Sequence, residues 1–155
     1  MLNRAMELAI QSSLEGVKDN EGGPFGAAIV YRNQVIAVAH NTVLKNHDPT
    51  CHAEMNAIRL ASQHLQTHML EGCEIYSTVE PCPMCMSAIY WARISKIFVG
   101  APKEIAEKYG FDDVAFYNEL HKSPAEREIP CEGMAMDKQV EQVFKTWQSL
   151  NRVLY

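Results

Sequence analysis

The hydrophobic and polar positions at the start of the chain follow two different periods. Small or apolar residues recur at intervals of three and four over residues 2–18, which predicts an amphipathic helix. The positions that define this helix are Leu2, Ala5, Met6, Ala9, Ser13 and Val17. Gly22-Gly23-Pro24 ends the pattern, and two short apolar runs, 27–31 and 35–40, then flank a polar turn. We therefore expect a β-hairpin, followed by a polar loop at 41–49.

The central part of the chain alternates between helix and strand. A second helix is expected from near Thr50 to about His64, followed by a strand at 74–78. A third helix at 83–92 and a strand at 94–100 complete the alternation. Strands that are joined through a helix pair in parallel, because the crossover returns the chain to the same end of the sheet.

The pattern beyond the last of these strands is weaker. A short helix is expected at 104–110, and neither helix nor strand is favoured at 112–121. Residues 129–136 are compatible with an edge strand, because their proline and glycine disfavour a central one. A final helix is expected over 137–150, with an apolar stripe on one face.

Together these elements predict an α/β fold in a single domain, residues 1–155. The expected architecture is a three-layer α/β/α sandwich around a mixed, roughly five-stranded central sheet. A chain of this length buries enough of its surface to form a core without disulfides or metals as staples.

Composition narrows the class of protein. Apolar residues make up 47% and charged residues 21% of the chain, as in soluble globular proteins. No apolar run approaches the ~20 residues that span a bilayer, and the N-terminus lacks a signal-peptide core. The five cysteines are an odd number, which favours a reducing compartment, so we expect a cytoplasmic protein. The net charge of −5 favours a small substrate over a nucleic acid.

Two short motifs carry the candidate chemistry. The first is H-A-E at residues 52–54, and the second is P-C-x-x-C at residues 81–85. Together they supply three residues that can bind zinc: His52, Cys82 and Cys85. Catalytic zinc sites keep three protein ligands and leave the fourth position for water. Glu54 is not needed as a ligand, and a carboxylate beside that water can act as its general base.

The spacing of these residues predicts how they meet. Pro83 favours the first turn of a helix, where no N–H donor is needed, so Cys82 and Cys85 lie at a helix N-terminus and share a face. His52 and Glu54 can converge on an ion only if they lie at the first turn of their own helix. We therefore expect two helix N-termini to face one zinc ion, which favours thiolate ligands and lowers the pKa of a bound water.

The two motifs match the signature of the zinc-dependent nucleobase deaminases. In detail, the chain resembles the short bacterial guanine deaminases of the cytidine/deoxycytidylate deaminase superfamily, from Gly22 to the C-terminus. The segments that carry this narrower resemblance are Gly23-Pro24-Phe25-Gly26, Asn41, Asp48-Pro49-Thr50, Ile89-Tyr90-Trp91-Ala92-Arg93, Gly110-Phe111-Asp112-Asp113, Pro124-Ala125-Glu126-Arg127 and Tyr155. The resemblance implies a cytidine-deaminase-like fold and one Zn²⁺ per chain.

The resemblance also implies a reaction. It is the hydrolytic deamination of guanine to xanthine and ammonia, a step of purine metabolism, by a zinc-activated hydroxide with Glu54 as the proton shuttle. Asp113 is implied as an acid that engages the amino group and assists proton transfer. Asp112 is adjacent to it, and the sequence does not separate the two.

Further residues are implied in binding the base. Asn41 is expected to hydrogen-bond it, the backbone N–H of Ala53 to hold its polar edge, and Phe25 and Trp91 to contact its faces. Tyr155 is expected to close over it. Trp91 is equally compatible with a core position, and Tyr155 with an ordinary chain end. A tail that crosses to a neighbour would make a homodimer with exchanged C-terminal segments.

Other functions stay open at this point. A tRNA adenosine deaminase shares both motifs, although the acidic charge opposes it, and guanosine or cytosine are further possible substrates. From a different class, the chain could be a zinc-stabilised binding module in which Cys51 supplies a fourth ligand. A redox-active Cys82–Cys85 pair is a third alternative.

Overall fold

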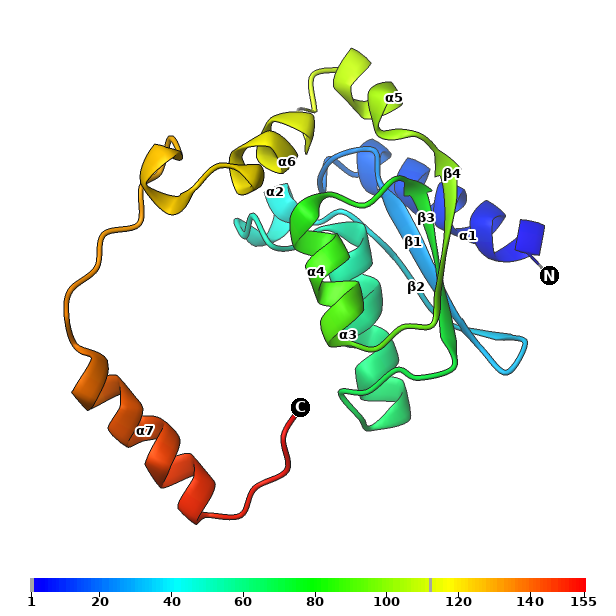
Figure 1. Cartoon of the computed structure of the whole chain (residues 1–155). Coiled ribbons are helices and arrows are strands. Elements are labelled where there is room, and N and C mark those ends of the chain that lie inside the picture. The colour runs from blue at the N-terminus through cyan, green and yellow to red at the C-terminus, as the bar shows by residue number, and fades with distance from the viewer. Residues whose placement is uncertain (1, 112) are drawn as a thin grey trace. The chain divides into compact units, whose positions relative to one another are not determined.

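The computed structural model describes residues 2–111 and 113–155 (Figure 1). The chain divides into two compact units, Met1–Tyr117 and Asn118–Tyr155, so the expected single domain stays a prediction. The first unit contains α1 (Leu2–Lys18), β1 (Gly26–Tyr31), β2 (Gln34–His40), α2 (Val43–Asn46), α3 (Ala53–Leu65), β3 (Cys73–Val79), α4 (Pro83–Trp91), β4 (Lys96–Ala101), α5 (Lys103–Lys108) and the start of α6 (Asp113–His121). The second unit contains the end of α6, a 3₁₀ turn, η1 (Pro124–Glu126), and α7 (Asp137–Ser149).

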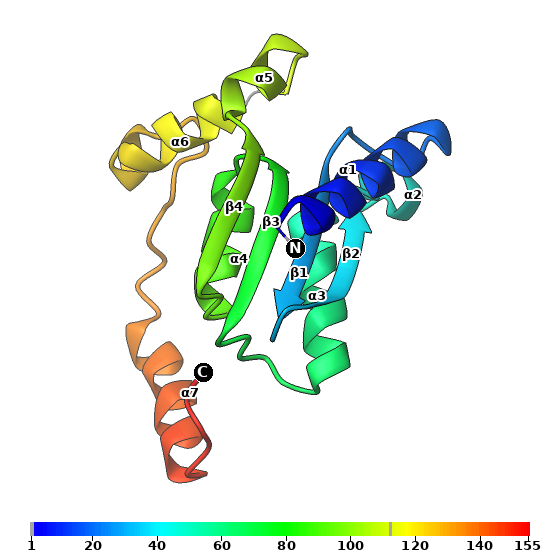
Figure 2. The same ribbon diagram turned by 90° about the vertical axis from the view of Figure 1, so that its right-hand side faces the viewer.

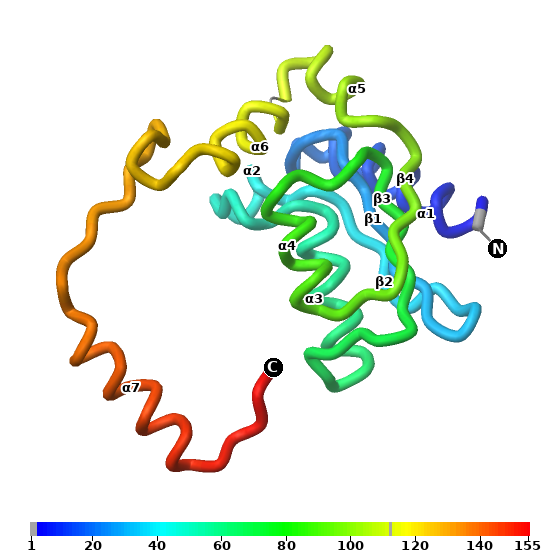
Figure 3. The backbone as a smooth tube through the Cα atoms, viewed as in Figure 1, coloured from blue at the N-terminus to red at the C-terminus, as the bar shows by residue number. Residues whose placement is uncertain are grey.

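The described sheet has four strands in the order β2-β1-β3-β4. The strand β1 is antiparallel to both β2 and β3, whereas β3 and β4 are parallel. The helix α4 connects the two parallel strands, as the tube in Figure 3 shows. The predicted hairpin and the predicted parallel pairing are both confirmed, and the sheet is mixed as expected.

The central strand β1 is buried on both of its faces, because helices cover both sides of the sheet (Figure 2). Ala27 and Ile29 point to one side and join the larger hydrophobic cluster with residues of α3 and α4. Ala28 and Val30 alternate with them and pack with α1 on the other side. This alternation follows from the two-residue period of a strand and gives the predicted three-layer sandwich.

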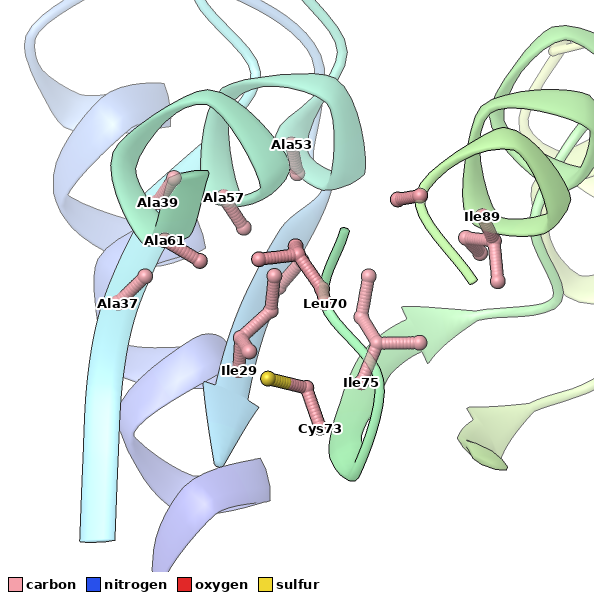
Figure 4. Packing of buried hydrophobic residues seen from close by; sticks show 12 residues of the cluster. Ile29, Ala37, Ala39, Ala53, Ala57, Ala61, Leu70, Cys73, Ile75 and Ile89 are labelled. Atoms are coloured by element: carbon pink, nitrogen blue, oxygen red, sulfur yellow. The ribbon is translucent and has the colours of Figure 1, made fainter. Parts of the chain in front are cut away.

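Small side chains bring α3 close to the sheet. Ala53, Ala57 and Ala61 are fully buried and recur every four residues, so they form one stripe along the helix. The stripe faces Ile29 and Ile75 of the sheet, with Leu70 filling the space between them (Figure 4). Close packing fixes both the height and the direction of α3, and thereby the place of its first turn.

Three details differ from the sequence-based expectations. The helix α3 begins at Ala53 rather than near Thr50, and a short helix, α2, lies in the expected polar loop. The expected edge strand at 129–136 is wrong, because the described residues there form no strand and the described sheet has four strands rather than five. Pro130 has no N–H to donate to a ladder, and this run carries exposed side chains that would gain little burial in a sheet.

The second unit has little core of its own. Its longest helix, α7, is amphipathic as predicted, but none of its residues is buried. Val143 and Phe144 on its apolar stripe are each 69% exposed. Among the residues that the structure describes, no helix combines the length and the apolar character that crossing a membrane requires.

A glycine sets the approach of α1 to the sheet and gives a test of the packing. A Cβ atom at Gly26 would lie 1.9 Å from the carbonyl oxygen of Ala9 on α1. We expect Gly26→Ala to lower the free energy of unfolding by about 1–3 kcal/mol in urea titrations, because the helix must move. The matched control is Gly133→Ala, since an added Cβ at Gly133 meets nothing within 4 Å. Equal stability of the two variants would contradict this view of the packing.

Candidate active site

Two helix N-termini supply the candidate metal ligands. His52 is the N-cap residue of α3, and Cys82 is the N-cap residue of α4; both have extended backbone conformations. Pro83 occupies the first turn of α4, as predicted, and Cys85 follows within that turn. The first turns of α3 and α4 therefore meet beside one edge of the sheet, with a histidine nitrogen and two sulfurs directed to one point.

The three side chains fit a zinc ion. The Nδ1 atom of His52 lies 3.5 Å from the Sγ atoms of both Cys82 and Cys85. Tetrahedral zinc with ordinary Zn–N and Zn–S bond lengths separates such atoms by about 3.5 Å. One nitrogen and two sulfurs suit zinc, and the fourth tetrahedral position is left for water. Within the described residues, these three side chains form the group able to hold a metal ion.

The cysteine next to the site has a different environment. The Cys51 thiol donates to Asp48 Oδ2 at 3.4 Å, and its sulfur accepts from Asn46 at the same distance. Cys51 is not part of the group of candidate ligands among the described residues. The structure therefore gives no support to Cys51 as a fourth ligand of a closed structural site.

The three candidate ligands shift one another's pKa values. A hydrogen-bonding contact with Cys85, with a further contribution from His52, lowers the pKa of the Cys82 thiol well below its usual range. The same pairing raises the pKa of the Cys85 thiol, and the hydrogen bond with Cys82 raises the pKa of His52. A bound cation takes the place of these protons, because zinc requires thiolate and neutral imidazole.

Glu54 lies beside this cluster, and its carboxyl group is hydrogen-bonded to a strand of the sheet. It is in the first turn of α3 and only 6% exposed. Ser77 of β3 donates its hydroxyl hydrogen to Oε1 at 2.8 Å, and Cys85 lies 3.4 Å from Oε2. Burial raises the pKa of Glu54 above the ordinary carboxyl value. Its carboxyl group is therefore oriented and able to carry a proton.

Ser77 is a site residue that sequence reasoning missed. It is 2% exposed and lies in the middle of β3, where its neighbours are apolar or β-branched. A hydroxyl at a buried strand position needs a partner, since burying a polar group without a hydrogen bond is unfavourable. A serine in the strand predicted at 74–78, on the same face as the apolar Ile75, was the signal that could have identified it.

A cleft opens in front of the candidate metal site. Its volume is about 610 Å³. Six of the residues singled out in the sequence border it: Phe25, Asn41, His52, Glu54, Cys82 and Asp113. These residues come from five separate segments of the first unit, so the fold, and not proximity in sequence, brings them together.

Asn41 is held at the wall of the cleft by its amide oxygen. Oδ1 accepts from the backbone N–H groups of Gly23, at 3.2 Å, and Val43, at 3.1 Å. These two donors fix which end of the amide is oxygen. Since the oxygen is engaged twice, the amide N–H groups are what Asn41 offers to a molecule in the cleft.

Gly110, Phe111, Asp113 and Phe116 form one side of the cleft, and three contacts of nearby residues attach this side to the rest of the first unit. Phe111 meets Phe25 edge to face, with 4.9 Å between the ring centroids. The Tyr117 hydroxyl donates to the carbonyl of Pro81 at 2.9 Å, and Lys103 pairs with Glu80 at 3.4 Å. Asp113 precedes Tyr117 by one helical turn and borders the cleft. Asp112 lies outside the described residues.

The remaining predicted residues lie elsewhere. Ala53 is fully buried at the start of α3, where backbone N–H groups lack partners within the helix. Trp91 is 62% exposed at the far end of α4 and borders a different surface hollow with Tyr90 and Arg93. The described chain does not bring Trp91 to the cleft, because α4 leads away from the metal ligands for two turns. Tyr155 belongs to the second unit, and its expected role stays a prediction.

The family described as the cytidine and deoxycytidylate deaminase zinc-binding region matches residues 1–101, a stretch that contains the three candidate ligands and Glu54. The chain belongs to this family. Membership agrees with the four-stranded mixed sheet, the helices on both faces and the His-Cys-Cys cluster. The cluster of His52, Cys82 and Cys85 is therefore a zinc site. The chain is a zinc-dependent deaminase, which is an enzyme of the hydrolase class.

Individual relatives cover most of the chain. Guanine deaminase of Bacillus subtilis (strain 168) is 42% identical over 148 residues, which are 96% of this chain and 92% of that protein. The X-ray structure of guanine deaminase from Bacillus subtilis superposes with a TM-score of 0.94 at 39% identity, covering 99% of this chain and 98% of the other.

Two further relatives bear on the choice of substrate. The tRNA-specific adenosine deaminase of Aquifex aeolicus is 37% identical over 127 residues, covering 82% of each chain. A variant of the NE0047 protein, solved in complex with 8-azaguanine, superposes with a TM-score of 0.69 at 31% identity, covering 73% of this chain and 65% of the other. Both proteins are at least 30% identical to this chain, and both alignments are long enough to include residues 52–85, which contain the three candidate ligands.

The pKa shifts in the cluster predict how acid affects the bound zinc. A raised pKa of His52 means that its nitrogen keeps a proton to a higher pH than the usual 6.5, and Cys85 likewise resists deprotonation. Zinc binding releases these protons, so the affinity for zinc falls as pH is lowered, by up to about tenfold per pH unit for each proton released.

Chelator competition between pH 8 and pH 5 measures this effect. The matched control is His64→Gln, in the last turn of the same helix, which should leave the profile unchanged. His52→Gln should weaken zinc binding at every pH. A zinc affinity that does not change over this pH range would contradict the ligand assignment.

Proposed function

We propose that this chain deaminates guanine, with water as the second substrate and xanthine and ammonia as products. The observation that carries the proposal is one cleft that borders the zinc ligands His52 and Cys82, the buried Glu54 and Asn41. It occurs in a chain that is 42% identical to a guanine deaminase along nearly its whole length. Single-domain organisation, residues 1–155, is part of the proposal.

The residues around the cleft suit a flat base with polar edges. Phe25 offers an aromatic ring for contact with the face of a purine. The N–H groups of Asn41 are donors for a carbonyl oxygen or ring nitrogen, both of which guanine has. The backbone N–H of Ala53, at the start of α3, is a further donor next to the zinc ligand. We do not assign Trp91 a base contact within one chain.

Glu54 moves the protons of the reaction. Water adds its oxygen to C2 of guanine, and Glu54 accepts the proton that the water releases. Glu54 then delivers this proton to a ring nitrogen. It takes the second proton of the former water and gives it to the amino group, so that the C2–N bond breaks and ammonia leaves. The hydrogen bond from Ser77 keeps one carboxyl oxygen in place throughout these transfers.

The bound zinc supplies a water of lowered pKa, so that a strong nucleophile is available at neutral pH. His52, Cys82 and Cys85 hold the ion and leave the cleft side open. Asp113, which also borders the cleft, engages the amino group of the base and assists its departure. Burial raises the pKa of Glu54 above the ordinary carboxyl value, which makes the group a better proton acceptor than an exposed carboxylate.

A tRNA adenosine deaminase is the second candidate, because the Aquifex aeolicus relative is 37% identical over 82% of the chain. The chemistry at zinc would be the same, and the pocket would take an adenine base extruded from RNA. The net charge of −5 opposes it, since binding to a phosphate backbone is favoured by basic surfaces. We therefore propose a small purine as the partner and no nucleic acid.

Assembly and location complete the proposal. We propose a homodimer with exchanged C-terminal segments, supported by the exposed apolar face of α7 and by the exposed tail residues Leu154 and Tyr155. An amphipathic helix with no buried residue gains stability by covering its apolar face on another surface. A cytoplasmic location is supported by five free cysteines, which persist in reducing compartments.

The role of Glu54 gives the direct test of this chemistry. Glu54→Gln keeps the shape of the side chain but cannot accept the proton from water. We expect kcat for guanine to fall by about 10²–10⁴-fold, measured as ammonia release, with one zinc per chain retained. The control Glu71→Gln removes an exposed carboxylate and should leave kcat unchanged. Full activity of Glu54→Gln would contradict the proposed mechanism.

The C-terminal tail gives a separate test. Deletion of Leu154 and Tyr155 removes the residues expected to close over the base. We expect the rate of guanine turnover to fall while the zinc content and the melting temperature stay the same, because both residues are exposed and the candidate metal ligands are His52, Cys82 and Cys85. Turnover equal to that of the full chain would remove the tail from the site.

A further inference from the structure

Asn56 has an unusual set of hydrogen bonds. It lies on α3, one turn after His52, and is half-buried. Its Nδ2 atom is 3.0 Å from the carbonyl oxygen of His40, 2.9 Å from Thr42 Oγ1 and 3.3 Å from the carbonyl oxygen of Cys51. An amide NH₂ group has two hydrogens, so three acceptors share them. An asparagine on a helix surface does not need three protein acceptors, because water can accept its hydrogen bonds.

The acceptors belong to the two segments that form the site. His40 and Thr42 are the residues immediately before and after Asn41, whose amide faces the cleft. Cys51 immediately precedes the zinc ligand His52. The backbone of Thr42 also donates to the Cys51 carbonyl at 2.9 Å. A single side chain thus connects the segment that carries Asn41 to the segment that carries His52.

The orientation of the Asn56 amide is itself fixed. Oδ1 accepts from Arg59 Nη1 at 3.0 Å, which identifies the oxygen end of the amide. The backbone N–H of Asn56 donates to the carbonyl of His52 at 2.9 Å, so the helix joins Asn56 to the zinc ligand through the main chain. Asn56 is therefore anchored on the metal side and reaches across to the substrate side.

We propose that Asn56 is a positioning residue that sets the separation between the base-binding amide of Asn41 and the zinc ligand His52. This separation decides how far the amine-bearing carbon of the bound base lies from the water at the metal. Misplacement by about 1 Å lowers the rate of a reaction of this kind by about 10²-fold. The inference rests on the proposed function, because it concerns how Asn41 binds a base.

A residue that only supports the fold would act independently of Asn41, so a double-mutant cycle separates the two roles. Asn41→Asp keeps the oxygen that binds Gly23 and Val43 and removes the N–H donors toward the cleft. Asn56→Ala removes the link without adding a charge. Asn56→Asp is the second variant, because it keeps the contact with Arg59 if the alanine form does not fold.

The zinc-loaded chain, both single variants and the double variant are compared by kcat/KM for guanine. Binding of 8-azaguanine is measured by calorimetry with Glu54→Gln added to each of the four forms, because 8-azaguanine carries the same amino group as guanine and would otherwise be deaminated. We expect Asn56→Ala to weaken both by at least about tenfold when Asn41 is present, and by less than about twofold in the Asn41→Asp background. Zinc content should remain one per chain in all four forms. The binding arm does not depend on turnover.

Asn46→Ala is the matched control. Asn46 also donates to Thr42 Oγ1, at 3.0 Å, and contacts the sulfur of Cys51, but it touches neither backbone carbonyl. It should leave binding and kcat/KM unchanged. An Asn56→Ala effect that is equal in both backgrounds, or no effect at all, would overturn the inference. An unaltered chain that neither binds 8-azaguanine nor releases ammonia from guanine would overturn the proposed function, and the role of Asn56 with it.

Discussion

The meeting of two helix N-termini at one edge of the sheet is the constraint on which the site depends. His52 and both cysteines bind one ion only if α3 and α4 begin at the same height, and the Nδ1–Sγ distances of 3.5 Å show that they do. Parallel pairing of β3 and β4 fixes α4, since this helix is their crossover. The alanine stripe fixes α3 against β1 and β2. Core packing therefore sets the geometry of the metal ligands.

The same arrangement gives Glu54 and Asn41 their properties. The first turn of α3 carries Glu54 into the interior, where burial raises its pKa and Ser77 orients it. The end of β2 carries Asn41 to the wall of the cleft, and backbone donors hold its oxygen. Asn56 reaches from α3 to this second segment. The candidate ligand His52, the proposed proton carrier Glu54 and the amide of Asn41 that is proposed to bind the base are thus connected to one another through α3.

Sequence reasoning identified the site where chemistry is local and missed what depends on long-range contacts. The ligands His52, Cys82 and Cys85 were predictable, because their spacing and Pro83 place them at helix starts. The β-hairpin, the parallel pair of strands and the three-layer sandwich were predictable from the spacing of hydrophobic residues, which distinguishes strands from helices. Ser77 and Asn56 were not predicted as site residues, since the contacts that connect them to the site, Ser77 with Glu54 and Asn56 with Thr42, join positions 23 and 14 residues apart. The prediction of a strand at 129–136 was wrong, because the hydrophobic periodicity of this segment is weak and Pro130 has no backbone N–H to donate to a neighbouring strand.

The measurement that tests the account most directly is ammonia release from guanine, guanosine, adenine, adenosine, cytosine and a tRNA anticodon stem–loop under identical conditions, with a chelator-treated sample beside each. The account predicts rapid release from guanine, loss of activity on zinc removal and recovery when zinc is returned. Release from the stem–loop or from cytosine instead of guanine would contradict the substrate assignment. Undiminished release after complete removal of zinc would contradict the role of the His52, Cys82 and Cys85 cluster.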